Sequence, residues 1–377
     1  MAVFNKKLLV LIGALVLSAC GSSAGPDPTS VIPIGGGAIG GGIPSGGHFD
    51  LLVARENLPG LVTGNFHTTF TVLLADRLGN YNMLTGTSVS FFTEAGAIAA
   101  SSVVDTTGVA TVDFRTQGPP PATVSPTVAE NTLIKRMGDD YGITTTNFPR
   151  LGWVTVLATV RGEEGFIDNN ANGIFDAGDS VTGPGFNFDL GEAFLDVDDN
   201  DKWESPELFF NDAGGTAGYD GLNGVWDGPG CTQAGCRTSP TIWASHTIMF
   251  TGNITYCAAT NVTTPITPTP TVPVTFNVAD GKTETIRFMV SDINLNRPVP
   301  GTKITATISS AGVLVGPTTY TVLDGIGGPF EVSFTIGDAV VGDNPVTPLP
   351  AQLTITVVAG NNEVLTCPQT VVNGTIK

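Results

Sequence analysis

The sequence predicts an all-β protein built from two β-sandwiches, the first of which carries an irregular acidic segment. The chain of 377 residues holds 48 Gly and 26 Pro but only 13% charged residues, a composition typical of short strands joined by tight turns. Apolar and polar residues alternate with a period of two in several stretches, as expected when one face of a strand is buried. A helical period of 3.6 residues persists nowhere for long.

Residues 1–19 are typical of a secretory signal peptide. Two lysines precede an apolar stretch from Leu8 to Leu17, and small residues follow it. The stretch is about ten residues long, half of what a helix needs to cross a bilayer. We therefore expect an exported protein whose first 19 residues are removed.

The residues Leu17-Ser18-Ala19-Cys20 resemble the lipobox of bacterial lipoproteins. The resemblance implies that Cys20 receives diacylglycerol on its thiol and a further acyl chain, such as palmitate, on its amino group after cleavage. Three acyl chains would hold the protein on a membrane, since one chain alone binds only marginally. Gly21 is not the aspartate that signals inner-membrane retention in the family, which favours an outer-membrane address in the cell envelope. A plain signal peptide with an incidental cysteine is the alternative.

The charge of the chain is concentrated in one window. The net charge of −18 argues against nucleic acid as a partner, because phosphate binding needs a basic face. From Glu163 to Asp227 there are sixteen Asp or Glu residues and a single basic residue, Lys202, so this window carries −15. The remainder of the chain is close to neutral.

Apart from Cys20, four cysteines form an even set in a chain expected to enter an oxidising compartment. Three pairings are possible. We favour Cys231 with Cys236, which closes a small loop, and Cys257 with Cys367, which ties the start of the last domain to its final strand. Zinc binding is the competing interpretation, although the sequence has no Cys-x-x-Cys pair and no nearby His cluster.

The first half of the chain is expected to hold a tether and then a sandwich. Residues 20–47 are Gly-rich and cannot bury a core, so we expect a lipidated flexible tether. The first sandwich is expected over residues 48–256, with a turn at Asp76–Asn80. Its predicted strands are Phe66–Ala75, Thr87–Phe92, Val109–Phe114, Trp153–Val160 and Thr241–Thr251.

The second sandwich, expected over residues 274–377, repeats the plan of the first. Residues 257–273 are rich in Thr and Pro, and we expect a stiff, extended linker there. The two halves end alike, on Ile-Met-Phe-Thr-Gly-Asn-Ile from Ile248 and Val-Val-Asn-Gly-Thr-Ile from Val371. These repeated features predict a duplicated sandwich. The predicted strands of the second copy are Thr285–Val290, Thr302–Ile308 and Phe330–Phe334.

The order of strand, Asp-containing turn, Gly-Thr, strand and Asp-x-x-Gly hairpin is similar to the bacterial immunoglobulin-like domains of the invasin and intimin type. The resemblance implies two immunoglobulin-like β-sandwiches. The first copy departs from the family plan at Gln117–Arg150, which is rich in Pro and Thr. It departs again at about residues 163–237, which we interpret as an acidic calcium-loop insertion.

One loop of this acidic segment has the ligand spacing of a calcium site. Residues 168–179 fit Asp-x-Asn-x-Asn-Gly, with further oxygen donors at positions nine and twelve. Calcium takes six to eight oxygen ligands, and Gly at position six lets the backbone turn sharply. The expected ligands are Asp168, Asn170, Asn172, the carbonyl of Ile174, Asp176 and Asp179.

A second loop, residues 196–207, keeps these donors but has Asp201 at position six, where Asp tolerates a positive φ better than most residues. A third, degenerate copy ends in Asn223-Gly-Val-Trp-Asp227. Glu-x-Phe-x-Asp/Asn leads into each of three loops and would place an aromatic anchor beside the ion. The expected ligands of the second loop are Asp196, Asp198, Asn200, the carbonyl of Lys202, Glu204 and Glu207.

These loops resemble the calcium loops of EF-hands and dockerins, which implies Ca²⁺ as the cofactor. The glycines and Pro184 that follow the first loop forbid a long exiting helix, so we do not expect a conformational sensor. The alternative is a solvated acidic loop without an ion. Magnesium is disfavoured by the number of protein oxygens on offer.

We expect a structural or adhesive protein anchored on a membrane by its N-terminal lipid. A module that binds another envelope protein, a cell-surface protein or a glycan is the alternative, with Trp203, Trp226 and Trp243 as candidate platform residues. We do not expect an enzyme, because no serine elbow or metal-hydrolase motif is present and calcium loops account for the paired carboxylates.

Overall fold

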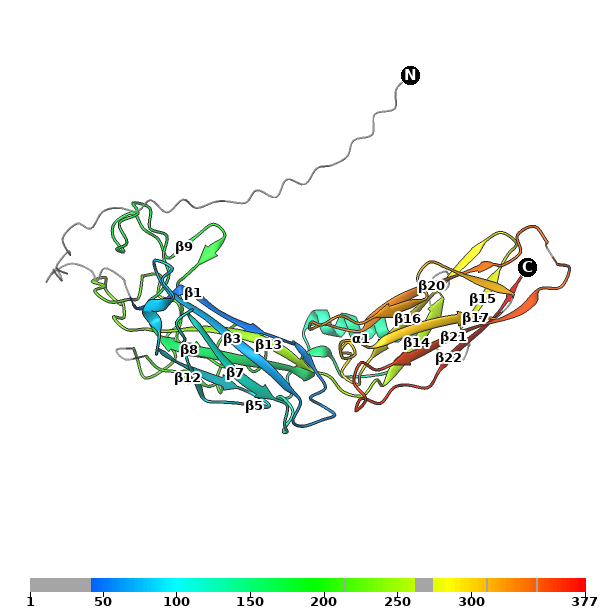
Figure 1. Ribbon diagram of the computed structural model, residues 1–377, viewed down its shortest axis with the longest axis horizontal. Helices are drawn as coiled ribbons and strands as arrows, with labels where there is room; N and C mark the ends of the chain where they lie inside the picture. Colours follow the sequence, from blue (N-terminus) through cyan, green and yellow to red (C-terminus); the bar gives the residue numbers. More distant parts are fainter. Residues whose placement is uncertain (1–41, 213–214, 262–273, 310, 344) are drawn as a thin grey trace, which may run out of the picture. The chain divides into compact units, whose positions relative to one another are not determined.

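The computed structural model describes residues 42–377 except 213–214, 262–273, 310 and 344 (Figure 1). The expected signal peptide, Cys20, most of the expected tether and most of the expected linker lie outside the described residues. The described residues all belong to one compact unit. Within the described part of the chain, no helix is long and apolar enough to cross a membrane.

The first sandwich pairs a four-stranded with a five-stranded sheet (Figure 1). Alternating residues of its strands are buried, and Phe70, Phe114 and Phe250 lie fully buried in the core. The four-stranded sheet has the order β1 (Pro44–Val53), β3 (His67–Asp76), β7 (Val109–Arg115) and β5 (Ala97–Ile98). The five-stranded sheet has the order β2 (Asn57–Leu58), β13 (Thr241–Phe250), β8 (Trp153–Arg161), β4 (Ser88–Thr93) and β6 (Ser101–Val103).

The second sandwich is built in the same way around a core that contains Phe288 and Phe334. Its four-stranded sheet has the order β14 (Tyr256–Asn261), β16 (Thr283–Ser291), β20 (Phe330–Asp338) and β18 (Gly312–Val315). Its five-stranded sheet has the order β15 (Thr275–Val278), β22 (Thr370–Ile376), β21 (Leu349–Val358), β17 (Lys303–Ile308) and β19 (Thr319–Thr321).

The two sandwiches share one topology. The strand orders match one for one when β1 is set against β14, β3 against β16, β8 against β21 and β13 against β22. In each copy the last strand also pairs in parallel with a very short strand, β13 with β2 and β22 with β15. The all-β fold with two sandwiches, predicted from alternation and repeated turns, is confirmed.

The acidic segment connects β8 to β13, which pair directly with Arg161 opposite Thr241. It contains two short strand pairs and otherwise consists of loops. In the second sandwich, the equivalent connection between β21 and β22 spans only residues 359–369. The short strands of the acidic segment are β9 (Thr182–Gly183), β10 (Phe186–Asn187), β11 (Ala193–Phe194) and β12 (Phe209–Phe210).

One helix was missed by the sequence prediction. Helix α1 (Val128–Tyr141) lies in the connection between β7 and β8, with the short 3-10 helix η2 (Pro149–Gly152) after it; another 3-10 helix, η1 (Asn82–Leu84), follows β3. The Thr127 side chain caps α1, since it accepts the N–H of Glu130 while the Glu130 carboxylate accepts that of Thr127. Its buried Met137 packs against Met289 of the second sandwich, and that contact supports a helix whose sequence lacks a long apolar period.

Two expected boundaries are corrected by strand pairing. We expected the tether to reach residue 47, but β1 begins at Pro44, and Glu163 exchanges backbone hydrogen bonds with Pro44 and Gly46. We expected a linker from residue 257, but Cys257 to Asn261 belong to β14, which pairs with β16. In both places the extended backbone gains sheet hydrogen bonds that the composition did not reveal.

Both expected disulfides are present. Cys231 is bonded to Cys236 within the acidic segment that connects β8 to β13. Cys257 in β14 is bonded to Cys367, just before β22, across a sequence separation of 110 residues. The second bond therefore joins the first strand of the second sandwich, β14, to the segment that leads into its last strand, β22.

Candidate metal centre

Residues 168–179, which we call loop 1, fold around the two carboxylates at their ends. Asp168 at position one accepts the backbone N–H groups of positions five and six, at 3.2 and 2.6 Å. Asp179 at position twelve accepts those of positions two and nine, at 2.9 and 3.0 Å. Gly173 at position six has a φ of +75°, as the predicted turn requires.

Residues 196–207, which we call loop 2, repeat this network. Asp196 accepts the N–H groups of positions five and six, at 3.2 and 2.8 Å. Glu207 accepts those of positions two and nine, both at 2.9 Å. Asp201 at position six has a φ of +61°, so this aspartate does take the conformation of the glycine that it replaces.

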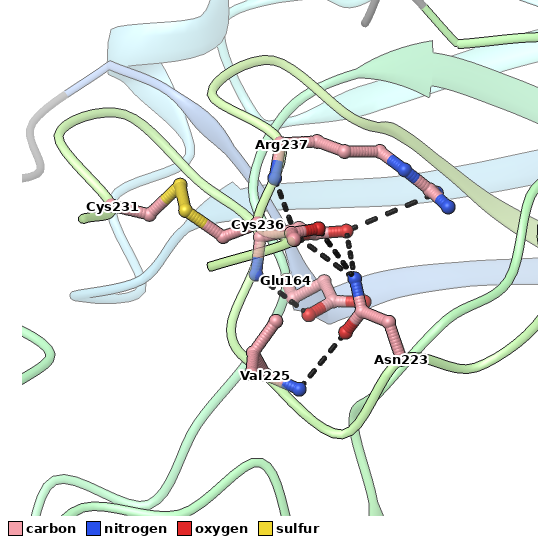
Figure 2. The surroundings of a disulfide bond; sticks show 8 residues. Glu164, Asn223, Val225, Cys231, Cys236 and Arg237 are labelled. Carbon is pink, nitrogen blue, oxygen red and sulfur yellow. Dashed lines mark hydrogen bonds and ion pairs between the residues drawn. A yellow bond between two sulfur atoms is a disulfide. The ribbon is translucent and has the colours of Figure 1, made fainter. Parts of the chain in front are cut away.

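The third, degenerate copy is completed by residues from distant parts of the chain. Asp189 accepts the N–H groups of residues 223 and 224, at 3.2 and 2.8 Å, and therefore stands at position one. Glu164 accepts those of Leu190 and Asp227, at 2.6 and 2.9 Å, and stands at position twelve. Figure 2 shows Glu164 beside Asn223 and Val225. We call this set the split loop, because sequence spacing could not reveal it.

The carboxylate of Glu192 also bridges two backbone N–H groups. It accepts the backbone N–H groups of Asp212 and Asp220, at 2.8 and 2.9 Å. The glutamates at the start of the three lead-ins, Glu164, Glu192 and Glu207, therefore each bridge two backbone N–H groups, and Glu164 and Glu207 do so from position twelve of a loop. The lead-in motif was recognised from the sequence, but this role of its glutamate was not.

Aromatic residues just before position nine join the loops in pairs. Phe175 of loop 1 stacks on Trp226 of the split loop, with ring centroids 5.3 Å apart, and Phe166 packs edge-on against both. Trp203 of loop 2 stacks in the same way on Tyr219, at 4.9 Å. The lead-in aromatics Phe166, Phe194 and Phe209 each pack edge-on against one of these rings.

Two buried arginines attach the loops to the first sandwich. Arg77, in the turn after β3, forms a buried ion pair with Glu163 and donates to the carbonyl of Gly173 in loop 1, at 2.9 Å. Arg150 pairs with Glu130 at the start of α1 and donates to the carbonyl of Asp198 in loop 2. The backbones of both loops are therefore held by the sandwich through charged donors.

Arg237 supplies the cation nearest to the split loop. It follows the Cys231–Cys236 disulfide, and its backbone N–H donates to Asp227 at 2.6 Å (Figure 2). Its guanidinium lies 3.5 Å from Asp212 and 3.8 Å from Asp227. One arginine therefore already compensates part of the charge at the split loop.

In loop 2, the guanidinium of Arg150 donates to a backbone carbonyl and is paired with Glu130 rather than with an acidic side chain of the loop. Asp196, Asp198 and Glu207 place one oxygen each within 4.8 Å of one another. Burial, with the charge of Asp196 adding to it, raises the pKa of Asp198, and burial also raises the pKa of Glu207. These directions describe a crowded negative site whose ionised form would be stabilised by a cation.

Glu94 and Asp199 lie beside this crowded site, and neither was predicted from the sequence to be a functional residue. Burial, assisted by the charge of Asp199, raises the pKa of Glu94 to about 8. Burial, assisted by the charge of Asp196, raises the pKa of Asp199 to about 7. Glu94 Oε1 accepts the N–H of Thr155 at 2.9 Å, but its buried Oε2 has no hydrogen-bond partner. A lone glutamate in the connection from β4 to β5 gives no sequence signal of this kind.

Other expected ligands are placed less tightly. In loop 1, the amide nitrogens of Asn170 and Asn172 donate to Asp176, so their hydrogen bonds stay within the loop. The N–H groups of Ile174 and Lys202, at position seven of each loop, donate to the asparagine two residues earlier. Glu204 is exposed. Of the two expected loops, loop 2 alone brings three acidic side chains into one cluster among the described residues.

A second acidic cluster lies on the second sandwich. Asp280, Asp338 and Asp343 place carboxylate oxygens within 4.8 Å of one another. It was not predicted from the sequence, because Asp280 follows β15, whereas Asp338 ends β20 and Asp343 lies shortly after it. It has no repeated backbone network like that of loops 1 and 2.

Trp203, Trp226 and Trp243 are wholly or partly buried, and His67 and His246 each contact a carboxylate. Trp226 is 3% exposed and therefore cannot be the exposed platform considered above. Trp203 and Trp243 are half-buried. His67 lies 2.8 Å from Asp113, and His246 lies 3.3 Å from Glu56. Both histidines contact carboxylates on the first sandwich, away from the loops.

No protein-family model matches this chain, and no curated protein is similar to it in sequence. The solved structures that it resembles include the Yersinia pseudotuberculosis adhesin InvE, at 11% identity and a TM-score of 0.25, over 89% of this chain and 60% of that chain. The D0-D1 domain of intimin is similar at 14% identity and a TM-score of 0.22, over 86% and 97%. Native E. coli alpha-2-macroglobulin is similar at 9% identity and a TM-score of 0.22, over 87% and 17%.

The chain thus spans less than two thirds of the InvE chain and a small part of the macroglobulin. These are distant similarities to immunoglobulin-like domains. They concern the fold and identify no ligand or partner.

Proposed function

We propose that the protein is a calcium-binding lipoprotein of the bacterial cell envelope with a structural or adhesive role. The observation that carries the proposal is the repeated network of loops 1 and 2. In both, the carboxylate at position one accepts two N–H groups, and the carboxylate at position twelve accepts two others. In loop 2, Asp196, Asp198 and Glu207 also place oxygens within 4.8 Å of one another, which supports a calcium site there.

The donor chemistry favours calcium over other metals. All side-chain donors of the two loops are oxygens, and cysteines and histidines are absent from both, which disfavours zinc and copper. The raised pKa values of Asp198 and Glu207 fit a site whose ionised carboxylates would be stabilised by a bound cation. Asp168, Asn170, Asn172, Asp176 and Asp179 would hold one ion in loop 1, and Asp196, Asp198, Asn200 and Glu207 would hold another in loop 2.

Bound calcium would act on stability. With millimolar external calcium and a dissociation constant on the order of 10 μM, each site would contribute about 2.7 kcal/mol to whatever it orders. The acidic segment buries few apolar side chains beyond its aromatic clusters, so its order should depend on the ions. The sandwiches have their own cores and should fold without calcium.

Calorimetry on the mature protein tests the calcium proposal, together with limited proteolysis in calcium and in chelator. Chelation should open residues 163–227 to proteases and leave both sandwiches intact. Asp168→Ala combined with Asp196→Ala should give the same cleavage pattern in calcium, whereas Asp50→Ala, on the exposed face of β1, should not. Absence of calcium binding together with an unchanged cleavage pattern would refute the proposal.

The membrane anchor is tested separately, through Cys20. Cys20→Ser should release the protein from the membrane fraction and abolish labelling with a palmitate analogue, because the thioether can no longer form. The wild-type protein should be labelled and sediment with membranes. A labelled, membrane-bound Cys20→Ser protein would contradict the anchor and leave the calcium proposal untouched.

A partner-binding module is the second candidate function. The groove formed by Trp203, Tyr219 and Trp243 beside loop 2 favours it. Binding of a partner is compatible with the structural role, because an anchored protein needs a contact to be adhesive.

A further inference from the structure

A groove of about 450 Å³ lies between loop 2 and β13, and it is the groove on which the second candidate function rests. Phe194, Trp203, Tyr219 and Trp243 form its aromatic lining, with Asp201 and Leu222 among its other residues. Its volume is within the range of sites that hold a small ligand or one large side chain. Leu222 is 63% exposed.

The indole N–H groups of the groove are already engaged within the fold. Trp203 Nε1 already donates to the carbonyl of Glu207, and Trp243 Nε1 to that of Gly191, both at 3.0 Å. Trp203 and Tyr219 are stacked with 16° between their planes, and each is only half-buried. The electron-rich faces of such rings attract cations.

The charge around the groove has the matching sign. Asp201 is exposed at the rim and stands at position six of loop 2, which contributes no side-chain ligand to an ion. The window from 163 to 227 carries −15, and two bound calcium ions would still leave −15 + 4 = −11. Lys202, the single basic residue of that window, also lines the groove beside Asp201, so the negative charge comes from the acidic segment as a whole rather than from the rim alone. This field repels phosphates and carboxylates and attracts cationic groups.

We propose that this groove binds an arginine side chain from a basic segment of a partner protein. A guanidinium is planar, stacks on aromatic rings and is weakly hydrated, so it fits a groove of ring faces with a carboxylate at the rim better than a lysine ammonium does. The exposed Leu222 gives the partner's flanking residues an apolar contact. The proposal rests on the proposed function only in that loop 2 must be ordered.

The test titrates the mature protein, in saturating calcium, with a short peptide containing three arginines while tryptophan fluorescence is recorded. The same peptide with citrulline in place of arginine keeps the shape and loses the charge. We expect the citrulline peptide to bind at least tenfold more weakly. We also expect arginine binding to weaken as salt rises, because the attraction is partly electrostatic.

Two matched variants locate the site. Leu222→Lys places a positive charge at the groove and should weaken arginine-peptide binding at least tenfold. Leu208→Lys adds the same charge to the same segment, at a residue that is 52% exposed and outside the groove, and should leave binding within about twofold. Asp201→Asn should weaken binding while it preserves the backbone conformation, since Asn also tolerates a positive φ.

Several results would overturn the proposal, and each points to a different kind of binding. Equal losses in the two lysine variants would mean general attraction to the acidic segment and would overturn the proposal. Equal binding of the citrulline peptide, or quenching by a neutral oligosaccharide that Leu222→Lys abolishes, would make the groove a site for uncharged ligands and would also overturn it. Calorimetry with calcium on each variant separates these outcomes from a failure of the calcium proposal.

Discussion

Glu94 lies between β4 and β5 beside loop 2, and Glu94→Gln is expected to stabilise the calcium-free protein. Folding takes this carboxyl from an ordinary pKa of 4.5 to about 8. At pH 7 the unfolded chain has it ionised and the folded chain has it protonated. The two and a half pH units between 4.5 and 7 correspond to about 3 kcal/mol, at 1.36 kcal/mol per unit. Glutamine has no charge to desolvate and should remove this cost.

The pH dependence has a defined sign. Because the folded-state pKa is raised, the folded protein binds more protons than the unfolded chain between about pH 4.5 and 8, and wild-type stability without calcium falls as the pH rises through that window. Glu94→Gln should flatten this fall and lose its advantage below about pH 4.5. The raised pKa of Asp199, about 7, acts in the same direction in both proteins and should remain.

Urea unfolding in chelator, followed by tryptophan fluorescence, measures this effect. All four tryptophans lie between residues 153 and 243, so the signal reports the first sandwich and its acidic segment. A gain of about 3 kcal/mol would raise the melting temperature by roughly 6–12 °C. Asp50→Asn removes an exposed carboxylate from the same sandwich and should change little. The reasoning is wrong if Glu94→Gln is no more stable than wild type at pH 7, or if wild-type stability is flat from pH 4.5 to 8.

Two further predictions concern stability. Replacing both Cys257 and Cys367 by Ser removes a cross-link across 110 residues and should cost about 4–5 kcal/mol in chemical unfolding of the second sandwich, whereas replacing Cys231 and Cys236 should cost about 2 kcal/mol; free thiols in the non-reduced wild type would contradict both values. Arg77→Met leaves Glu163 buried without its cation and should cost about 3–5 kcal/mol, most of which Glu163→Leu in the same chain should restore. A double variant as unstable as Arg77→Met alone would show that the loss has another cause.

Local patterns of the fold could be predicted from the sequence, and contacts between distant segments could not. The turn at Asp76–Asn80 could be predicted because it is local: the Asp76 carboxylate accepts the N–H groups of residues two and four positions later. Helix α1 was missed because its amphipathic pattern is weak, although Thr127 and Glu130 form a capping box that the sequence spells out. Its packing against the second sandwich is a tertiary contact, which propensity does not report.

The candidate site divides in the same way. Loops 1 and 2 are contiguous, so spacing alone indicated them, and Asp201 at position six was correctly accepted. The split loop needs Glu164, Asp189 and Asp227, which come together only when the segment folds back on itself. Glu94 lies near loop 2 in the connection between β4 and β5, which belong to different sheets, and no pattern in its own neighbourhood indicates that proximity.

The shared topology of the sandwiches, with unequal connections at one place, has a consequence for folding rates. Pairing β8 with β13 requires closure of residues 162–240, whereas pairing β21 with β22 closes only residues 359–369. Closure entropy grows with the logarithm of loop length, and the difference is about 2 kcal/mol, or roughly a factor of 20 to 30 in rate if closure limits folding. The second sandwich should therefore reach its native pairing first although it is synthesised last. The first sandwich then remains for longer in a state whose unpaired strand edges are exposed to other chains.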